Sequence, residues 1–297
     1  MVKILDLPEE ELMYPGTRAC SGCAMSLIIR ITLKALGKNT IITIPASCST
    51  VLTGMQGFST LKVSILNTPF ATAGASASGI VASLESKNLD DDINVLAFAG
   101  DGGTTDIGIQ ALSGAAERGT NFIYMCYDNE AYMNTGVQRS GSTPYGAFTT
   151  TTPSGKKKHR KDMAKILEAH NIPFVATASA GYPLDLYEKV QKAKNIKGTK
   201  YIHVHAPCPP GWGFDPRFTI KIAKLAVETG FWPLYEVIEG KFELSINSKK
   251  YLNPEKRKPI EEYLKAQKRF KNISEEELDI YRKYIDSLWK NIEKRLE

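Results

Sequence analysis

The segment 93–136, INVLAFAGDGGTTDIGIQALSGAAERGTNFIYMCYDNEAYMNTG, decides the predicted fold of this chain. The apolar run 95–99 predicts a strand, the amphipathic spacing over 106–118 predicts a helix, and the apolar run 122–127 predicts a second strand. A strand–helix–strand unit builds a parallel sheet, and open parallel sheets bind ligands at the carboxyl ends of their strands. Both strands here end in polar residues, so we expect a ligand at that edge.

A glycine-rich turn follows the first of these strands. Gly100, Gly102 and Gly103 surround Asp101. Glycine lets the backbone approach a phosphate closely, and the N-terminus of the following helix favours an anion at the same place. A carboxylate beside a diphosphate requires a cation between them, most simply Mg²⁺, which prefers oxygen ligands. The alternative is a tight turn capped by Asp101, but it does not explain the glycines on both sides of the aspartate.

Polar residues also follow the second strand. The side chain of Asn129, 28 residues after Asp101, and the carbonyl of Ala131 can supply further oxygen ligands to Mg²⁺. A GDG sequence followed by an asparagine at the next strand end is similar to the diphosphate-binding motif of thiamine diphosphate (ThDP) enzymes. This similarity implies bound ThDP and Mg²⁺. The polar segment 131–153 is too long for a passive connection, so we expect a functional loop there.

Four of the five cysteines form a candidate metal site. Cys20 and Cys23 make a C-x2-C pair, whereas Cys48 and Cys208 follow predicted strand ends. Four thiolates suit a structural Zn²⁺ or a [4Fe–4S] cluster, and the spacing alone does not separate the two. A redox-active C-x-x-C pair is a third option, which needs no distant partners. Cys126 lies in an apolar strand, and we interpret it as an inert buried thiol.

Helices and strands alternate along the rest of the chain. The predicted helices span 24–36, 71–84, 161–170 and 184–193, and the predicted strands span 40–44, 62–66, 174–179 and 201–206. This alternation predicts an α/β fold with a doubly wound, mostly parallel sheet. His203 and His205 point to the same face of the last strand, and we interpret both as structural.

The composition changes after residue 240, because 26 of the last 57 residues are charged. Ser274 and Glu277 predict a capping box, and one apolar stripe predicts a long amphipathic helix: Leu278, Tyr281, Ile285, Leu288, Ile292 and Leu296. We expect this stripe to pack on a partner or on the sheet edge. The predicted organisation is an α/β domain over 1–240, which carries the ThDP, Mg²⁺ and cluster sites, and a charged, mainly helical extension over 241–297.

The formal net charge of +6 is modest and is concentrated in the run Lys156–Lys161 and in the C-terminal segment. These runs would suit an acidic partner, such as a ferredoxin or the phosphates of coenzyme A, or they are solvated surface. No basic stripe is interleaved with stacking aromatic residues, so we expect no nucleic-acid binding. No apolar stretch approaches the roughly 18 residues of a membrane span, and the start of the sequence lacks a signal-peptide pattern. We therefore expect a cytoplasmic protein without a membrane span.

Eight motifs occur in a distinctive order: ACSGCA, SCST, GDGGTTDIG, DNEAYMNTGVQRSGSTP, TTTTPSGKKKHRKDMAKI, VATASAGYP, HVHAPCPPGW and ETGFWPLYEV. Over about residues 14–240 the chain resembles the ThDP-binding β subunit of pyruvate:ferredoxin oxidoreductase (pyruvate synthase), within the 2-oxoacid:ferredoxin oxidoreductase family. The resemblance implies one [4Fe–4S] cluster, which leaves zinc as a minor alternative, and its ligands would be Cys20, Cys23, Cys48 and Cys208. It also assigns Asn134 to the active site, near the substrate and the reactive carbon of ThDP.

Two positions depart from the pattern of this family. Asn129 replaces a threonine of some relatives, and Ser47 stands where a glycine often precedes the third cysteine. Neither change removes a plausible ligand, although both could alter the geometry of their loops.

The resemblance implies that pyruvate, coenzyme A and oxidised ferredoxin are converted to acetyl-CoA, CO₂ and reduced ferredoxin, or the reverse. A chain of 297 residues holds one α/β layer of this kind, so we expect activity only with partners. These are an α subunit with the pyrimidine-binding domain and its glutamate, a γ subunit and a ferredoxin-like δ subunit. One alternative is a related oxidoreductase that acts on a branched-chain 2-oxoacid, 2-oxoglutarate or oxalate. A second is a non-redox ThDP decarboxylase or synthase subunit with structural zinc. A third is an electron-transfer subunit without ThDP.

Overall fold

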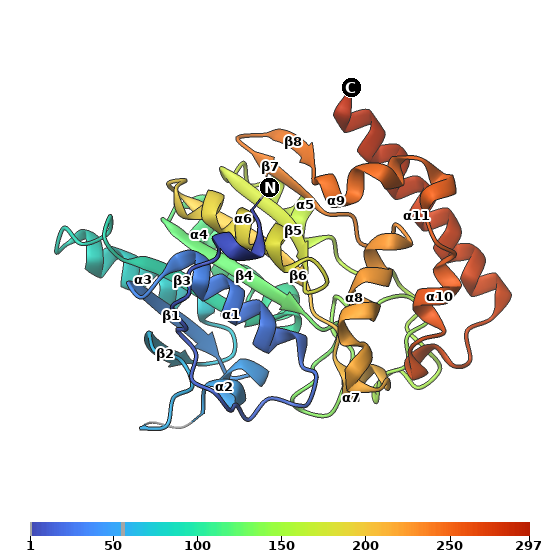
Figure 1. Cartoon of the computed structure of the whole chain (residues 1–297), viewed down its shortest axis with the longest axis horizontal. Helices are drawn as coiled ribbons and strands as arrows, with labels where there is room; N and C mark the ends of the chain where they lie inside the picture. The colour runs from blue at the N-terminus through green and yellow to red at the C-terminus, as the bar shows by residue number, and fades with distance from the viewer. Residues whose placement is uncertain (1, 55–56) are drawn as a thin grey trace.

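An eight-stranded sheet crosses the described part of the chain, residues 2–54 and 57–297 of the computed structural model, in the order β2-β1-β3-β4-β6-β5-β7-β8 (Figure 1). The strands are β1 Thr40–Pro45, β2 Ser64–Thr68, β3 Asn94–Gly100, β4 Phe122–Asp128, β5 Phe174–Ser179, β6 Thr199–His205, β7 Tyr235–Ile238 and β8 Lys241–Leu244. The pairs among β1 to β6 are parallel, whereas β7 pairs antiparallel with both β5 and β8. The predicted doubly wound, mostly parallel sheet is confirmed.

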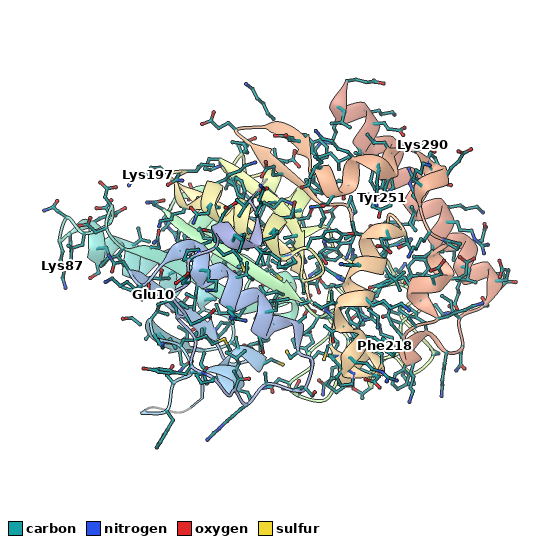
Figure 2. All side chains as sticks on the ribbon, viewed as in Figure 1. Glu10, Lys87, Lys197, Phe218, Tyr251 and Lys290 are labelled. Atoms are coloured by element: carbon teal, nitrogen blue, oxygen red, sulfur yellow. The ribbon has the colours of Figure 1, made fainter. Side chains whose placement is uncertain are left out.

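Helices cover both faces of the sheet. They are α1 Ala24–Leu36, α2 Cys48–Thr53, α3 Ala73–Glu85, α4 Ile109–Glu117, α5 Met163–Glu168, α6 Pro183–Lys194, α7 Pro209–Trp212, α8 Thr219–Glu228, α9 Ile246–Lys249, α10 Ile260–Leu264 and α11 Glu275–Leu296. Alternate residues of β3 enter different cores: Leu96 and Phe98 pack with α1 and α6, whereas Ala97 and Ala99 pack with α3 and α4. Charged side chains such as Lys197 and Lys290 lie at the periphery (Figure 2). Within the described residues, each helix is too short or too polar to cross a membrane.

Short helical turns join several of these elements. They are η1 Ile4–Asp6, η2 Gly102–Asp106, η3 Pro216–Phe218, η4 Lys250–Leu252, η5 Pro254–Lys256 and η6 Lys268–Phe270. The turn η2 is π-helical, which delays the helix predicted from residue 106 until Ile109. A second element also begins later than predicted: the strand expected at 62–66 is β2, which spans Ser64–Thr68.

The order of the strands creates a switch in the direction of winding. From β1 the chain passes to β2 on one side, whereas β3 lies on the other side of β1. The loops that follow β1 and β3 therefore separate at the carboxyl edge of the sheet, and this is where open α/β sheets bind ligands. These loops carry Cys48 and the glycine turn.

The segment after residue 240 continues the sheet before it becomes helical. β8 pairs with β7, and Ile238 is opposite Lys241, so the predicted boundary at 240 lies in the turn between these strands. The predicted capping box of α11 is present, with Ser274 Oγ accepting from the Glu277 amide at 3.2 Å. The apolar face of α11 was expected on a partner or on the sheet edge. The helix does contact the edge strand β8, and most of its apolar face is buried in the core of the chain itself, from Leu278 to Ile292.

We predict that Trp289→Ala lowers the free energy of unfolding by about 3–5 kcal/mol, the usual cost of emptying a buried aromatic site. The side chain is 1% exposed, and its indole N–H donates to the Gly230 carbonyl at 2.8 Å. Leu296→Ala is the matched control, because Leu296 is 45% exposed at the end of the same helix. Chemical denaturation followed by circular dichroism measures both changes. Equal stability of the two variants would show that α11 is not part of the folded unit.

Candidate active site

Two adjoining cavities lie at the carboxyl edge of the sheet. The first, the glycine-turn cavity, is lined by most of the residues predicted to contact ThDP and Mg²⁺: Gly100, Gly102, Gly103, Asn129, Ala131 and Asn134, together with Cys48. A Cβ atom at Gly102 would lie 2.6 Å from the ring of Tyr132, so only glycine fits there. Gly100, Gly102 and Gly103 all line the cavity, so a ligand there can approach their backbone closely, as a diphosphate site requires.

The predicted cation ligands meet beneath this cavity. One terminal atom of the Asn129 amide lies 2.9 Å from Asp101 Oδ1 and 2.8 Å from the Ala131 carbonyl oxygen. Without an ion, the amide nitrogen satisfies both contacts by donating to them. With an ion, the amide can turn its oxygen inward, so that a carboxylate, an amide and a carbonyl oxygen face one point. Such oxygen donors suit Mg²⁺.

The electrostatic environment of Asp101 also suits a cation. The side chain is 1% exposed, and burial together with the charge of Asp128 raises its pKa well above the ordinary value. Its second oxygen accepts a hydrogen bond from Ser140 Oγ at 2.5 Å. A buried carboxylate that lacks a charged partner is unfavourable, and a bound cation would remove that penalty. The residues present therefore fit a magnesium ion.

The four predicted cluster cysteines line the second cavity, which we call the cysteine cavity: Cys20, Cys23, Cys48 and Cys208. Burial raises the pKa values of the Cys48 and Cys208 thiols to about 12, and the charges of the other cluster cysteines add to the effect. This mutual influence places the four sulfur atoms in one neighbourhood. No three His, Cys, Asp or Glu side chains in the described residues are gathered closely enough to hold a metal ion by themselves.

Local structure orients main-chain N–H groups toward these sulfur atoms. Cys23 and Cys208 are the N-cap residues of α1 and α7, and Cys48 is the first residue of α2. The first-turn N–H groups of α1 and α7 lie beside Cys23 and Cys208, and such main-chain donors oppose the effect of burial on the pKa of each thiol. Because N–H donors stabilise thiolates, this donor set fits an iron–sulfur cluster.

Four residues line both cavities and so form their common wall: Cys48, Tyr127, Asn129 and Asn134. The hydroxyl of Tyr127 lies 3.1 Å from both Ser47 Oγ and Ser49 Oγ, the residues on either side of Cys48. Ser47, which departs from the family pattern, therefore has a partner within this wall. A group bound in one cavity would be a neighbour of a group bound in the other.

The segment 131–153, predicted to be functional, supplies a contact that sequence reasoning missed. Ser140 holds Asp101, and the loop that carries Ser140 is held by Lys156, whose Nζ donates to the carbonyls of Thr143 at 2.6 Å and Gly141 at 3.1 Å. Burial lowers the pKa of Lys156 to about 8. One serine among several in a polar loop carries no signal that singles it out.

The basic run Lys156–Lys161 is exposed over most of its length, as expected of a partner-steering or solvated surface, but Lys156 is buried and Arg160 is half-buried. Lys156 is 3% exposed, and the guanidinium of Arg160 stacks 4.2 Å from the ring of Trp232. Lys161 Nζ reaches Asp106 Oδ1 at 2.9 Å, and Asp106 also accepts from the Tyr132 hydroxyl at 2.9 Å. Parts of this run therefore support the glycine-turn cavity from behind.

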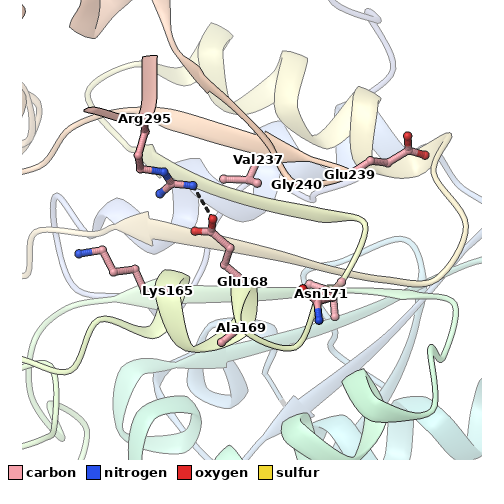
Figure 3. A pocket seen from close by; sticks show the side chains of 9 residues that line it. Lys165, Glu168, Ala169, Asn171, Val237, Glu239, Gly240 and Arg295 are labelled. Atoms are coloured by element: carbon pink, nitrogen blue, oxygen red, sulfur yellow. Dashed lines mark hydrogen bonds and ion pairs between the residues drawn. The ribbon is translucent and has the colours of Figure 1, made fainter. Parts of the chain in front are cut away.

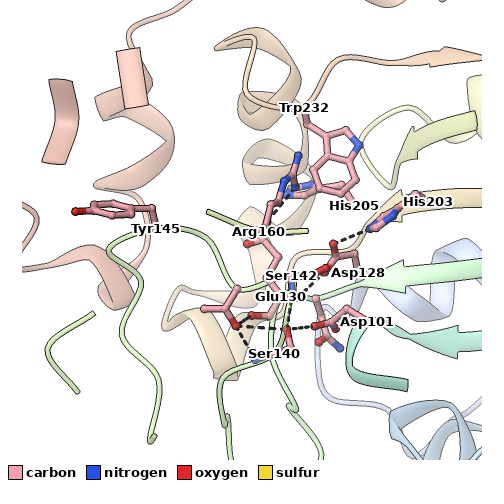
Figure 4. Close-up of polar contacts among 12 residues, drawn as sticks. Asp101, Asp128, Glu130, Ser140, Ser142, Tyr145, Arg160, His203, His205 and Trp232 are labelled. Atoms are coloured by element: carbon pink, nitrogen blue, oxygen red, sulfur yellow. Dashed lines mark hydrogen bonds and ion pairs between the residues drawn. The ribbon is translucent and has the colours of Figure 1, made fainter. Parts of the chain in front are cut away.

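The remaining candidates are structural, as interpreted. His203 Nε2 lies 2.7 Å from Asp128 Oδ2 (Figure 4). His205 Nε2 lies 3.0 Å from the Tyr263 hydroxyl. Burial lowers the pKa of His205 well below its ordinary value and raises that of the Cys126 thiol. Neither histidine approaches the common wall through a contact of this kind.

A third cavity, of about 730 Å³, lies away from these sites. It is formed by α5, the β7–β8 turn and the end of α11, next to the start of β5 and hence at the opposite edge of the sheet (Figure 3). Its lining is charged and includes the pair Arg295–Glu168. No predicted site residue lines it.

Comparisons with known proteins agree with this geometry. Residues 47–204 match the family model of the thiamine pyrophosphate enzyme, C-terminal TPP binding domain, and thiamine pyrophosphate is ThDP. The pyruvate synthase subunit PorB of Methanothermobacter thermautotrophicus is 50% identical over 96% of this chain and 98% of its own. The ketoisovalerate oxidoreductase subunit VorB of Pyrococcus abyssi is 47% identical over 99% of this chain and 96% of its own length.

A solved structure shares the fold. The 2-oxoglutarate:ferredoxin oxidoreductase from Magnetococcus marinus superposes with a TM-score of 0.57 at 24% identity, over 68% of this chain and 70% of that one. The family match itself begins at Ser47 and ends in β6, so it includes the glycine turn and the predicted cation ligands. The chain therefore belongs to the thiamine pyrophosphate enzyme family, in the group that contains the PorB and VorB subunits.

Proposed function

We propose that this chain is the β subunit of a cytoplasmic, ThDP-dependent 2-oxoacid:ferredoxin oxidoreductase that acts on pyruvate and coenzyme A. The observation that carries the proposal is the common wall of the two cavities, formed by Cys48, Tyr127, Asn129 and Asn134. An enzyme that passes electrons from a reacting carbon to a metal centre needs two such neighbouring sites. The names of the relatives at 50% and 47% identity support the same class of reaction.

In this proposal the glycine-turn cavity holds the diphosphate of ThDP. The backbone of Gly100, Gly102 and Gly103 would face the diphosphate, and Mg²⁺ would be bound by Asp101, the Asn129 side chain and the Ala131 carbonyl. ThDP supplies the nucleophilic carbon and the electron sink for decarboxylation of a 2-oxoacid. The contribution of the protein is to fix the diphosphate and to keep Asp101 ionised and oriented through Ser140.

The cysteine cavity would hold one [4Fe–4S] cluster through Cys20, Cys23, Cys48 and Cys208. Such a cluster supplies a one-electron acceptor. The amides of Met25, Ser26 and Gly211 would stabilise its thiolate ligands. Asn134 lines both cavities, which supports the proposal that its amide would hydrogen-bond a substrate carbonyl between the two groups.

Partner subunits complete the proposed enzyme. The relatives are named as subunits, and ThDP enzymes use a pyrimidine-binding domain that a single α/β layer does not supply. We propose an α subunit with that domain, a γ subunit, and a ferredoxin-like δ subunit that passes electrons to ferredoxin. A branched-chain 2-oxoacid is the second candidate substrate, because the VorB relative covers 99% of this chain at an identity close to that of PorB.

The reaction is tested with the enzyme purified anaerobically together with its partner subunits. We expect it to reduce a viologen dye with pyruvate and coenzyme A, faster than with 2-oxoisovalerate, 2-oxoglutarate or oxalate. The chain expressed alone should show no turnover. Full activity of the isolated chain, or no reaction with any 2-oxoacid, would contradict the proposal.

Substitution of a cluster ligand tests the cysteine cavity. We predict that Cys208→Ser lowers the iron and acid-labile sulfide content by at least about half and weakens the brown absorption, because a [4Fe–4S] cluster is held by four cysteines. Cys126→Ser is the matched control and should retain both, since Cys126 is buried within β4. Stoichiometric zinc in place of iron in the wild-type protein would favour the non-redox alternative.

Substitution of Asp101 tests the cation site. We predict that Asp101→Asn weakens Mg²⁺-dependent binding of ThDP by about 100-fold or more, since even outer-shell changes cost about 10–100-fold. Asp279→Asn is the matched control, because Asp279 lies on the solvent side of α11 and pairs with Lys283. Calorimetric titration of ThDP at several Mg²⁺ concentrations measures both variants. Wild-type binding by Asp101→Asn would exclude this aspartate as a ligand.

A further inference from the structure

A buried ion pair joins the C-terminal segment to the loop of the candidate cation ligands. Glu130 lies between Asn129 and Ala131, and its carboxylate is fully buried. Arg269, which belongs to η6, donates a hydrogen bond to Glu130 Oε2. Arg160 is the other cation facing this carboxylate, at 3.8 Å from Oε1 (Figure 4). Arg269 is thus the direct partner of Glu130.

The backbone at Glu130 adopts a conformation that needs support. Its φ of +66° is in the left-handed region, which residues other than glycine seldom occupy. The amide of Glu130 donates to Asp128 Oδ1 at 2.9 Å, and its carbonyl accepts from Thr143 Oγ1 at 2.7 Å. The carboxylate is the third anchor, and Arg269 holds it. This turn brings the Asn129 amide group against both the Ala131 carbonyl and Asp101 Oδ1.

Arg269 also supports the same loop from a second side. Its guanidinium lies 3.8 Å from the ring of Trp212, and the indole N–H of Trp212 donates to the Asn129 carbonyl at 2.8 Å. Trp212 in turn donates its amide to the Cys208 carbonyl at 2.9 Å. Arg269 therefore contacts both the Glu130 carboxylate and Trp212, the residue that links the loop of Asn129 and Ala131 to the turn of Cys208.

We propose that Arg269 is a positioning residue for the cation site: through Glu130 and Trp212 it fixes Asn129 and Ala131 and so sets the affinity for Mg²⁺ and the diphosphate of ThDP. The inference rests on the proposed function of the glycine-turn cavity. It assigns a role in cofactor binding to the segment 241–297, which lies outside the residues 47–204 of the family match. Loss of Arg269 would leave the Glu130 carboxylate buried without its direct partner, and the loop would move to expose it.

The test uses the enzyme purified with its partner subunits and measures ThDP binding calorimetrically at a series of Mg²⁺ concentrations. We expect Arg269→Met to raise the apparent Mg²⁺ dissociation constant by about tenfold or more, the usual cost of losing an outer-shell partner. Arg282→Met is the matched control and should bind as the wild type does, because Arg282 lies at the surface of α11 and pairs with Glu261 and Glu275. Arg269→Lys should recover part of the loss, since the charge is kept.

A second variant covers the case in which Arg269→Met does not fold. The pair Glu130→Gln with Arg269→Met removes both charges of this ion pair together, so neither is left buried without the other and the variant should fold. It still lacks the anchor and should bind Mg²⁺ more weakly than the wild type. A folded variant without Arg269 that retains wild-type Mg²⁺ affinity would overturn the inference while leaving the proposed function intact. Wild-type protein that binds ThDP without Mg²⁺, or Asp101→Asn that binds normally, would overturn the proposed function and the inference together.

Discussion

The structure depends on how three buried carboxylates at one edge of the sheet are compensated. Asp128 has His203, whose hydrogen bond and charge oppose burial and lower the pKa of that carboxyl group. Glu130 has Arg269, although burial still raises its pKa. Asp101 has only the neutral Ser140 and Asn129. Because an uncompensated buried charge is costly, the cation proposed to bind beside Asp101 would supply the compensation that this carboxylate lacks.

The topology explains why residues far apart in sequence can share this edge. The reversal of winding at β1 separates the loops after β1 and β3, so Cys48 and the glycine turn border an open space rather than a packed helix. Cys208 reaches the same place because β6 inserts beside β4, with His205 opposite Asp128. The order of the strands, rather than any local motif, makes the two cavities neighbours.

The elements and most of the residues that line the glycine-turn cavity could be predicted because their signals are local. Apolar runs marked β3 and β4, and Gly100–Gly103 marked the turn, since these features act over a few residues. Ser140, Lys156 and Arg269 could not be predicted, because each acts through a tertiary contact that leaves no spacing in the sequence. Trp289 was also missed: it is 1% exposed, whereas Leu296 of the predicted stripe is 45% exposed, because the packing surface does not extend to the end of α11.

The burial of positive charges could not be predicted from the sequence either, and it affects what the charge says about binding partners. A formal charge of +6 suggests a surface that attracts acidic proteins. Yet Lys156, Arg160 and Arg269 are turned inward, where they hold carbonyl groups, Glu130 and aromatic rings. Only solvent-facing cations of the basic run, such as Lys157, act at long range, and Lys157 already pairs with Glu277. Part of the charge that the sequence assigns to an interaction surface therefore lies inside the protein, next to the proposed cation site.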